Sequence, residues 1–180
     1  MAAKKRRSKE KKDSVPGARS KRGYRKHMLL FLAKFFVIYF ILTALVELSD
    51  LSLLTNSIAG LAAQPLGFAV EGSVIHLDGR SFEVTNSCTG LASAAILAAL
   101  VFGLRKPSFG KKLAVFLAGL AALLLLNIPR VMLVLFAAGA GFDANAVHVY
   151  TWFLMSGAVL AAWYYGNKKI AKVRDFGGMI

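Results

Sequence analysis

The chain has 180 residues, 57% of them hydrophobic, and carries a formal net charge of +14. The positive charge is concentrated at residues 4–26, 105–112 and 168–174, and long apolar stretches separate these clusters. A soluble domain of this size would not need so much apolar sequence. Because about 20 apolar residues cross the hydrocarbon core of a bilayer, the composition predicts a membrane protein and excludes a soluble nucleic-acid binder.

Two basic tails flank the apolar part of the chain. Residues 1–27 and residues 167–180 are both predicted to be cytoplasmic tails. A Lys- and Arg-rich segment beside a membrane span usually fixes the orientation of that span, and binding to nucleic acid or anionic lipid is the alternative. Pro16, Gly17 and the scarcity of apolar residues predict disorder up to about Tyr24.

Residues 28–166, between the tails, are predicted to form one membrane-embedded domain. Four apolar stretches in this domain have the length and composition of membrane spans. In chain order, they are residues 28–48, 88–104, 113–138 and 148–165.

The segment between the first two spans is predicted to lie at the membrane surface. Residues 51–70 mix apolar and polar side chains and indicate an amphipathic helix that ends near Pro65; a further span is the alternative. Residues 70–84 place Asp78 and Gly79 between apolar stretches, which is typical of a β-hairpin. The predicted fold class is an all-α integral membrane protein with about four transmembrane helices, an outer amphipathic helix and a small β-hairpin.

Charge predicts the orientation of the spans. With four spans, both tails and the basic loop at 105–112 lie in the cytoplasm, and Arg80 is the one cation in the outer loops. This arrangement follows the positive-inside rule, whereas a span at 51–70 would translocate the basic loop and the C-terminal tail. We therefore expect a multi-pass plasma-membrane protein with both termini in the cytoplasm.

Three reactive side chains are predicted to meet at the outer depth of the membrane, namely Cys88, Arg130 and His148. An arginine inside a span costs on the order of 3 kcal/mol and usually faces a partner or an aqueous cavity. Asn127 lies three residues before Arg130 and shares its helix face. The alternative is that Arg130 extends to the outer interface.

Cys88 is the single cysteine of the chain and suits the role of a nucleophile. Asn86 or Ser87 would cap the helix that follows, and the helix N-terminus together with Arg130 would favour a thiolate. His148 is predicted to open the last span as a neutral acid or base. The alternatives are an inert packed cysteine and an interfacial histidine.

No cofactor is expected, and a metal site is disfavoured. Cys88, His148 and Asp143 lack the close spacing of metal ligands, and Arg130 would repel the ion. His76 lies on the predicted hairpin and is expected to be a surface residue.

The chain resembles the exosortase/archaeosortase family of membrane transpeptidase-like enzymes over about residues 28–166. The resemblance is carried by three motifs: Asn86-Ser87-Cys88-Thr89-Gly90-Leu91 at a helix start, Asn127-Ile128-Pro129-Arg130 within a later span, and His148 at the start of the next. It implies that Cys88 is the nucleophile and that Arg130 and His148 are the other catalytic residues. Many members have additional spans, so this chain is near the minimal core.

The resemblance also implies a reaction and a class of substrate. The expected substrates are membrane-anchored proteins whose C-terminal sorting signal has a short motif, a transmembrane helix and a basic cluster. The enzyme would cleave this signal at the outer face through a thioester, with support from Asn127 and Asn86. Water as the acceptor would give a protease, and a lipid or surface amine a transpeptidase.

Two other classes of function are compatible with a membrane protein of this size. In a non-enzymatic scaffold or assembly factor, Cys88 and Arg130 would serve only packing and pairing. A small transporter would need a continuous polar path through both leaflets, which the apolar inner halves of the spans disfavour, and no internal repeat is visible.

Overall fold

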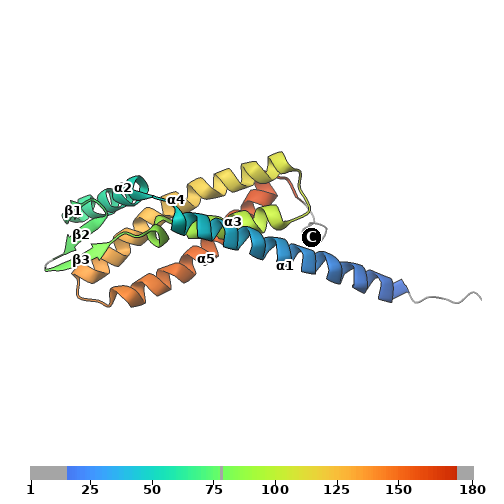
Figure 1. The fold of residues 1–180 in the computed structure, drawn as a ribbon, viewed down its shortest axis with the longest axis horizontal. Helices are drawn as coiled ribbons and strands as arrows, with labels where there is room; N and C mark the ends of the chain where they lie inside the picture. Colours follow the sequence, from blue (N-terminus) through green and yellow to red (C-terminus); the bar gives the residue numbers. More distant parts are fainter. Residues whose placement is uncertain (1–15, 78, 174–180) are drawn as a thin grey trace, which may run out of the picture.

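Three long helices form the framework of the molecule (Figure 1). The computed structural model describes residues 16–77 and 79–173, with side chains from residue 25 onward. The long helices are α1 (Pro16–Leu48), α4 (Phe109–Gly139) and α5 (Ala144–Lys169). Each contains a stretch long and apolar enough to cross a membrane. The prediction of a mainly helical membrane protein is therefore confirmed.

A shorter apolar helix, α3 (Leu91–Gly103), packs against α1, α4 and α5. It has 13 residues, or about 20 Å at 1.5 Å per residue. It is shorter than the span predicted over residues 88–104, because the chain makes a separate turn at residues 86–89. Its buried residues include Ala94, Ala95, Ala98 and Ala99. Such small side chains let neighbouring helices approach closely.

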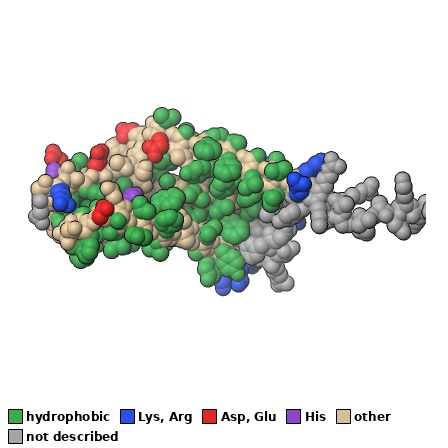
Figure 2. Space-filling model, turned by 90° about the horizontal axis from the view of Figure 1, so that it is seen from below, with side chains coloured by type: hydrophobic (Ala, Val, Ile, Leu, Met, Phe, Trp, Pro, Cys, Tyr) green, Lys and Arg blue, Asp and Glu red, His purple; other side chains and the backbone are tan. Residues whose placement is uncertain are grey.

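The outward faces of the long helices are apolar. Phe40, Leu125 and Leu154, one from each helix, are 63%, 69% and 72% exposed. Figure 2 shows hydrophobic side chains over the middle of the molecule. Apolar side chains displayed this widely fit a lipid environment, because a soluble monomer rarely exposes large contiguous apolar patches.

The first helix begins earlier than predicted. α1 starts at Pro16, so residues 16–24 are helical where disorder was predicted. Proline is well tolerated in the first turn of a helix because its missing N–H needs no partner there. Residues 1–15 and 174–180, which belong to the two predicted tails, lie outside the described residues.

A small subdomain covers one end of the helices (Figure 1). It consists of α2 (Ser52–Ala63), a 3₁₀ turn η1 (Gln64–Leu66), and the antiparallel strands β1 (Ala69–Glu71), β2 (Val74–Leu77) and β3 (Arg80–Glu83) in the order β1-β2-β3. α2 has 12 residues, or about 18 Å. It packs against β1 and β2 in this subdomain, which supports the predicted surface helix over the alternative of a span at 51–70.

The predicted hairpin is present as β2 and β3, and β1 adds a strand that the sequence did not reveal. Gly72 and Gly79, in the turns that follow β1 and β2, have φ of +60° and +82°, which glycine adopts without steric cost. Asp78 lies outside the described residues. Ile75 and Leu77 are buried in a cluster with residues of α2 and α4, and His76 is exposed as predicted.

The two ends of the molecule carry opposite charge. The described acidic residues belong to the end with α2 and the strands (Figure 2), and they are Glu47, Asp50, Glu71, Glu83 and Asp143. Lys and Arg side chains gather at the opposite end, near the start of α1, the α3–α4 loop and the end of α5. Arg80, in the hairpin, and Arg130, in the second half of α4, are the exceptions. We call these the acidic end and the basic end.

Candidate active site

Cys88 lies in a 3₁₀ turn, η2 (Asn86–Thr89), and its side chain is buried, with 7% exposure. The helix α3 begins only at Leu91, so Cys88 precedes the helix and does not lie in its first turn. The N-cap residue of α3 is Gly90, and the side chain that bonds to the first turn is Thr89, whose Oγ1 accepts from Leu91 N–H at 3.4 Å. The prediction that Asn86 or Ser87 caps this helix is therefore wrong. The helix N-terminus therefore acts on Cys88 from a greater distance than expected.

The polar residues before Cys88 attach η2 to the end of α1. Asn86 Nδ2 donates hydrogen bonds to the carbonyl oxygens of Val46 (3.0 Å) and Ser49 (3.2 Å). Ser87 Oγ donates to Glu47 Oε1 at 3.3 Å. The last carbonyls of a helix have no partner within the helix, so Asn86 satisfies them and fixes the turn that carries Cys88.

Asn127 holds the other side of this turn. It is fully buried in the middle of α4, and its Nδ2 donates to the Cys88 carbonyl oxygen at 2.6 Å. Gly90 has φ of +83°, and a Cβ atom on it would lie 3.1 Å from Asn127 Cβ. The turn therefore lies against α4 at a separation that only glycine permits.

Replacing Gly90 by alanine is expected to destabilise the protein and reduce its activity. The left-handed backbone costs a non-glycine residue about 1–2 kcal/mol, and the added methyl group would push Asn127 away from the Cys88 carbonyl. Thermal unfolding of the purified protein in detergent measures the loss. Gly157→Ala is the matched control, since no atom lies within 4 Å of a Cβ there and alanine favours helix. Equal stability of the two variants would contradict the prediction.

Arg130 connects α4 to α5. Its Nη1 donates to Asn127 Oδ1 (3.2 Å), and its Nε donates to Thr151 Oγ1 (3.3 Å). Its Nη2 lies 3.3 Å from His148 Nε2 and 3.5 Å from His148 Nδ1. With 9% exposure, Arg130 is buried. The alternative that it extends to the interface is therefore wrong, and it faces polar partners instead.

The structure brings the three predicted site residues together. Cys88, Arg130 and His148 line one small cavity of about 10 Å³, together with Phe82, Val131 and Val134. They come from η2, α4 and α5, which are far apart in the sequence. A cavity of this size has room for about one water molecule.

Comparison with known protein families matches residues 15–165 to the transmembrane exosortases. The match covers most of the chain. The chain belongs to the transmembrane exosortase family. The family comprises membrane transpeptidase-like enzymes of protein sorting, and the resemblance inferred from the three motifs is thereby confirmed. No curated protein and no solved structure matches the chain.

Three residues around the exosortase site were not predicted. Thr151 Oγ1 accepts the bond from Arg130 Nε and donates to the His148 carbonyl oxygen at 2.9 Å. Thr85 Oγ1 lies 3.7 Å from Cys88 Sγ. Phe82 lines the small cavity from the hairpin. The spacing of Thr151, three residues after His148, could have revealed it, whereas the position of Phe82 depends on the tertiary fold.

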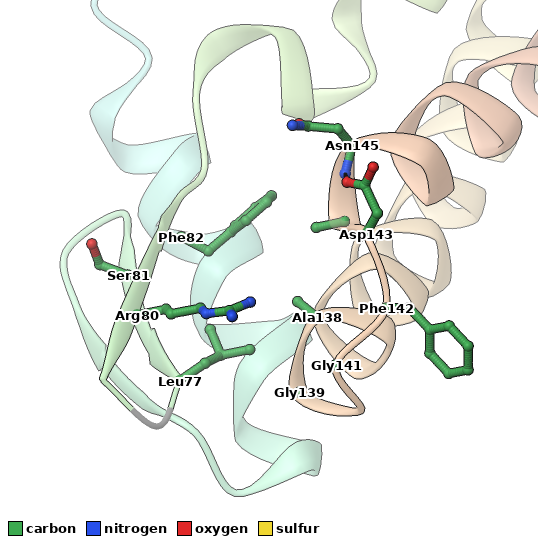
Figure 3. Close-up of a pocket in the computed structure, with 11 residues that line it drawn as sticks. Leu77, Arg80, Ser81, Phe82, Ala138, Gly139, Gly141, Phe142, Asp143 and Asn145 are labelled. Carbon is green, nitrogen blue, oxygen red and sulfur yellow. Dashed lines mark hydrogen bonds between the residues drawn. The ribbon is translucent and has the colours of Figure 1, made fainter.

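A larger cleft lies between the hairpin and the α4–α5 turn (Figure 3). Its volume is about 460 Å³, which is in the range of ligand pockets. Leu77, Arg80 and Phe82 line one side of the cleft, and Asp143 and Asn145 belong to the other. In Figure 3 the Arg80 side chain points across the cleft toward the α4–α5 turn. Phe82 also lines the small cavity beside Cys88, so it lies between this cleft and that cavity.

The hydrogen bonds of Arg130 leave it able to bind a further group. A guanidinium has five N–H donors, and three of its N–H groups are directed at Asn127, Thr151 and His148. The other two N–H groups have no hydrogen-bond partner among the described residues, and Arg130 lines the same cavity as Cys88. Within residues 16–77 and 79–173, no cluster of three or more His, Cys, Asp or Glu residues could hold a metal ion.

Proposed function

We propose that this exosortase is a cysteine peptidase or transpeptidase that cleaves the C-terminal sorting signal of membrane-anchored proteins. The observation that carries the proposal is the buried Arg130, which contacts His148 and Asn127 and lines the same cavity as Cys88. A buried guanidinium with donors to spare, beside the only thiol of the chain, is suited to stabilise negative charge on sulfur or on an oxyanion.

The first step is attack of Cys88 Sγ on the scissile carbonyl carbon. The S–C bond forms, the carbonyl oxygen becomes an oxyanion, and the two remaining donors of Arg130 bind it. When the tetrahedral intermediate collapses, the C–N bond breaks and the thioester remains on Cys88. The membrane helix of the substrate leaves as the free amine.

His148 transfers the protons in this scheme. Arg130 Nη2 lies within 3.5 Å of both ring nitrogens of His148, and because a guanidinium only donates hydrogen bonds, this contact favours the neutral imidazole. In the first step the lone-pair nitrogen of His148 exchanges its contact with Arg130 for the Cys88 thiol, takes the thiol proton and later passes it to the leaving amine. In the second half it activates the acceptor, which is water in a protease and a lipid or surface amine in a transpeptidase.

The distribution of charge supports an active site at the outer face. Most lysines and arginines of the described residues gather at the basic end, and the positive-inside rule predicts that such an end, with both termini, lies in the cytoplasm. In this orientation Cys88 lies toward the outer face of the membrane. The cleft between the hairpin and the α4–α5 turn lies at the acidic end and would hold the extended segment of the substrate before its membrane helix.

Trapping of the thioester with hydroxylamine tests the proposed function. The purified exosortase would be incubated in detergent with a host membrane protein that has a C-terminal helix and a basic tail. Hydroxylamine attacks thioesters, so we expect a shortened protein that ends in a hydroxamate, identified by mass spectrometry. A substrate that stays full-length with wild type, in cells and in detergent, would instead support the non-enzymatic scaffold.

A further inference from the structure

The basic end contains an open pocket of about 290 Å³, at the end of α3 that is farther from Cys88. α1 contributes four of its lining residues, and the end of α3 and the loop after it contribute two. They are His27, Leu30, Phe31, Lys34, Gly103 and Arg105. None of them belongs to the candidate active site, so this pocket needs a separate explanation.

The polar wall of the pocket is cationic. Lys34 and Arg105 carry positive charge, both side chains are exposed, and neither forms an ion pair with another described residue. Lys112 lies close enough to Lys34 for the two positive charges to repel each other. Lys112 is buried, and its Nζ donates to the Leu104 carbonyl oxygen. Among the described residues, several cations therefore lie close together at this pocket and no acidic side chain pairs with them. A bound anion would reduce the repulsion between these cations.

The other wall of the pocket is apolar and continuous with the lipid-facing surface. Leu30 is 54% exposed and lies near the N-terminal end of the apolar stretch of α1. A Cβ atom on Gly103 would lie 3.2 Å from Phe31 Cε2, so α1 and α3 are in close contact beside the pocket. The pocket therefore combines a cationic wall with an apolar one at the boundary of the hydrocarbon.

We propose that this pocket binds the headgroup phosphate of an anionic phospholipid. The phosphate oxygens would accept hydrogen bonds from Lys34 and Arg105, and the acyl chains would lie along Leu30 and Phe31. Basic pockets between membrane helices on the cytoplasmic side are suited to anionic headgroups. The apolar wall favours a lipid over free phosphate, because inorganic phosphate gains nothing from apolar contact. The proposal does not depend on the cysteine chemistry.

Lipid retention in nanodiscs tests the proposal. The full-length exosortase would be placed in phosphatidylcholine nanodiscs with increasing phosphatidylglycerol, and retained lipids would be counted by native mass spectrometry. We expect preferential retention of phosphatidylglycerol. The double variant Lys34→Gln/Arg105→Gln should weaken it by about fivefold for each charge removed, since a cation near the surface contributes about 1 kcal/mol. Both side chains are exposed, so the variant should fold normally.

The matched control is Lys168→Gln/Lys169→Gln, which removes two charges at the basic end outside the pocket. We expect this control to retain phosphatidylglycerol as wild type does. Equal weakening in both double variants would show a diffuse effect of charge and overturn the proposal. Inorganic phosphate added to phosphatidylcholine nanodiscs should not raise the melting temperature. If inorganic phosphate raised the melting temperature of the protein as much as phosphatidylglycerol does, the pocket would be an ion site and the assignment to lipid would be overturned.

Discussion

Cys88→Ala is expected to abolish processing of the sorting signal, with a loss on the order of 10³-fold or more. The thiol is the only cysteine sulfur in the chain, and no other side chain lining the small cavity is a nucleophile of comparable strength. The measurement is the size of a surface protein with a C-terminal helix and basic tail, in cells with matched membrane levels of each variant. Cys88→Ser should also fail, because an unactivated hydroxyl is a much weaker nucleophile than a thiolate.

Ser87→Ala is the matched control for Cys88→Ala. Ser87 lies in the same turn, is exposed, and bonds to Glu47 instead of lining the cavity. It should process the substrate at nearly the wild-type rate. If Cys88→Ala also processed normally, the nucleophile assignment would be wrong and the scaffold would be the better explanation.

Arg130→Lys is expected to lower processing by about 10²- to 10³-fold, the usual effect of losing an oxyanion donor. Lysine keeps the charge but lacks the planar fork, so it cannot reach Asn127, Thr151 and His148 together. The lost bonds at Asn127 and Thr151 should also destabilise the protein by about 1–3 kcal/mol. The measurements are the processing rate and thermal unfolding in detergent.

Two further variants separate catalysis from stability. Arg80→Lys makes the same change at the exposed arginine of the cleft, outside the cavity that Cys88 lines, and should keep most of the activity. Thr151→Val removes only one partner of Arg130 and should reduce stability more than rate. Wild-type processing by Arg130→Lys would contradict the proposed role of the guanidinium fork as an oxyanion donor, because lysine keeps the charge and loses only the fork.

The residues of the candidate site were easier to predict from the sequence than the contacts that hold them in place. Cys88, Arg130 and His148 were singled out because a charged side chain within a span and a thiol at a span boundary are costly or unusual in any membrane fold. The prediction that Asn86 caps the following helix was wrong. Its amide group can either cap the next helix or bond to a distant one, and only the position of α1 decides between them.

Apolar length and charge are local properties, and from them the sequence alone determined that the chain is a membrane protein with a small subdomain after its first apolar helix. They also indicated three reactive residues at one depth. Tertiary structure decided the rest. The third strand β1, the short α3 and the contact of Phe82 with the cavity depend on which segments pack together. The periodicity of a sequence shows which face of a helix is apolar. Which segment packs against that face depends on contacts between residues far apart in the chain, such as the close approach of Gly90 to Asn127.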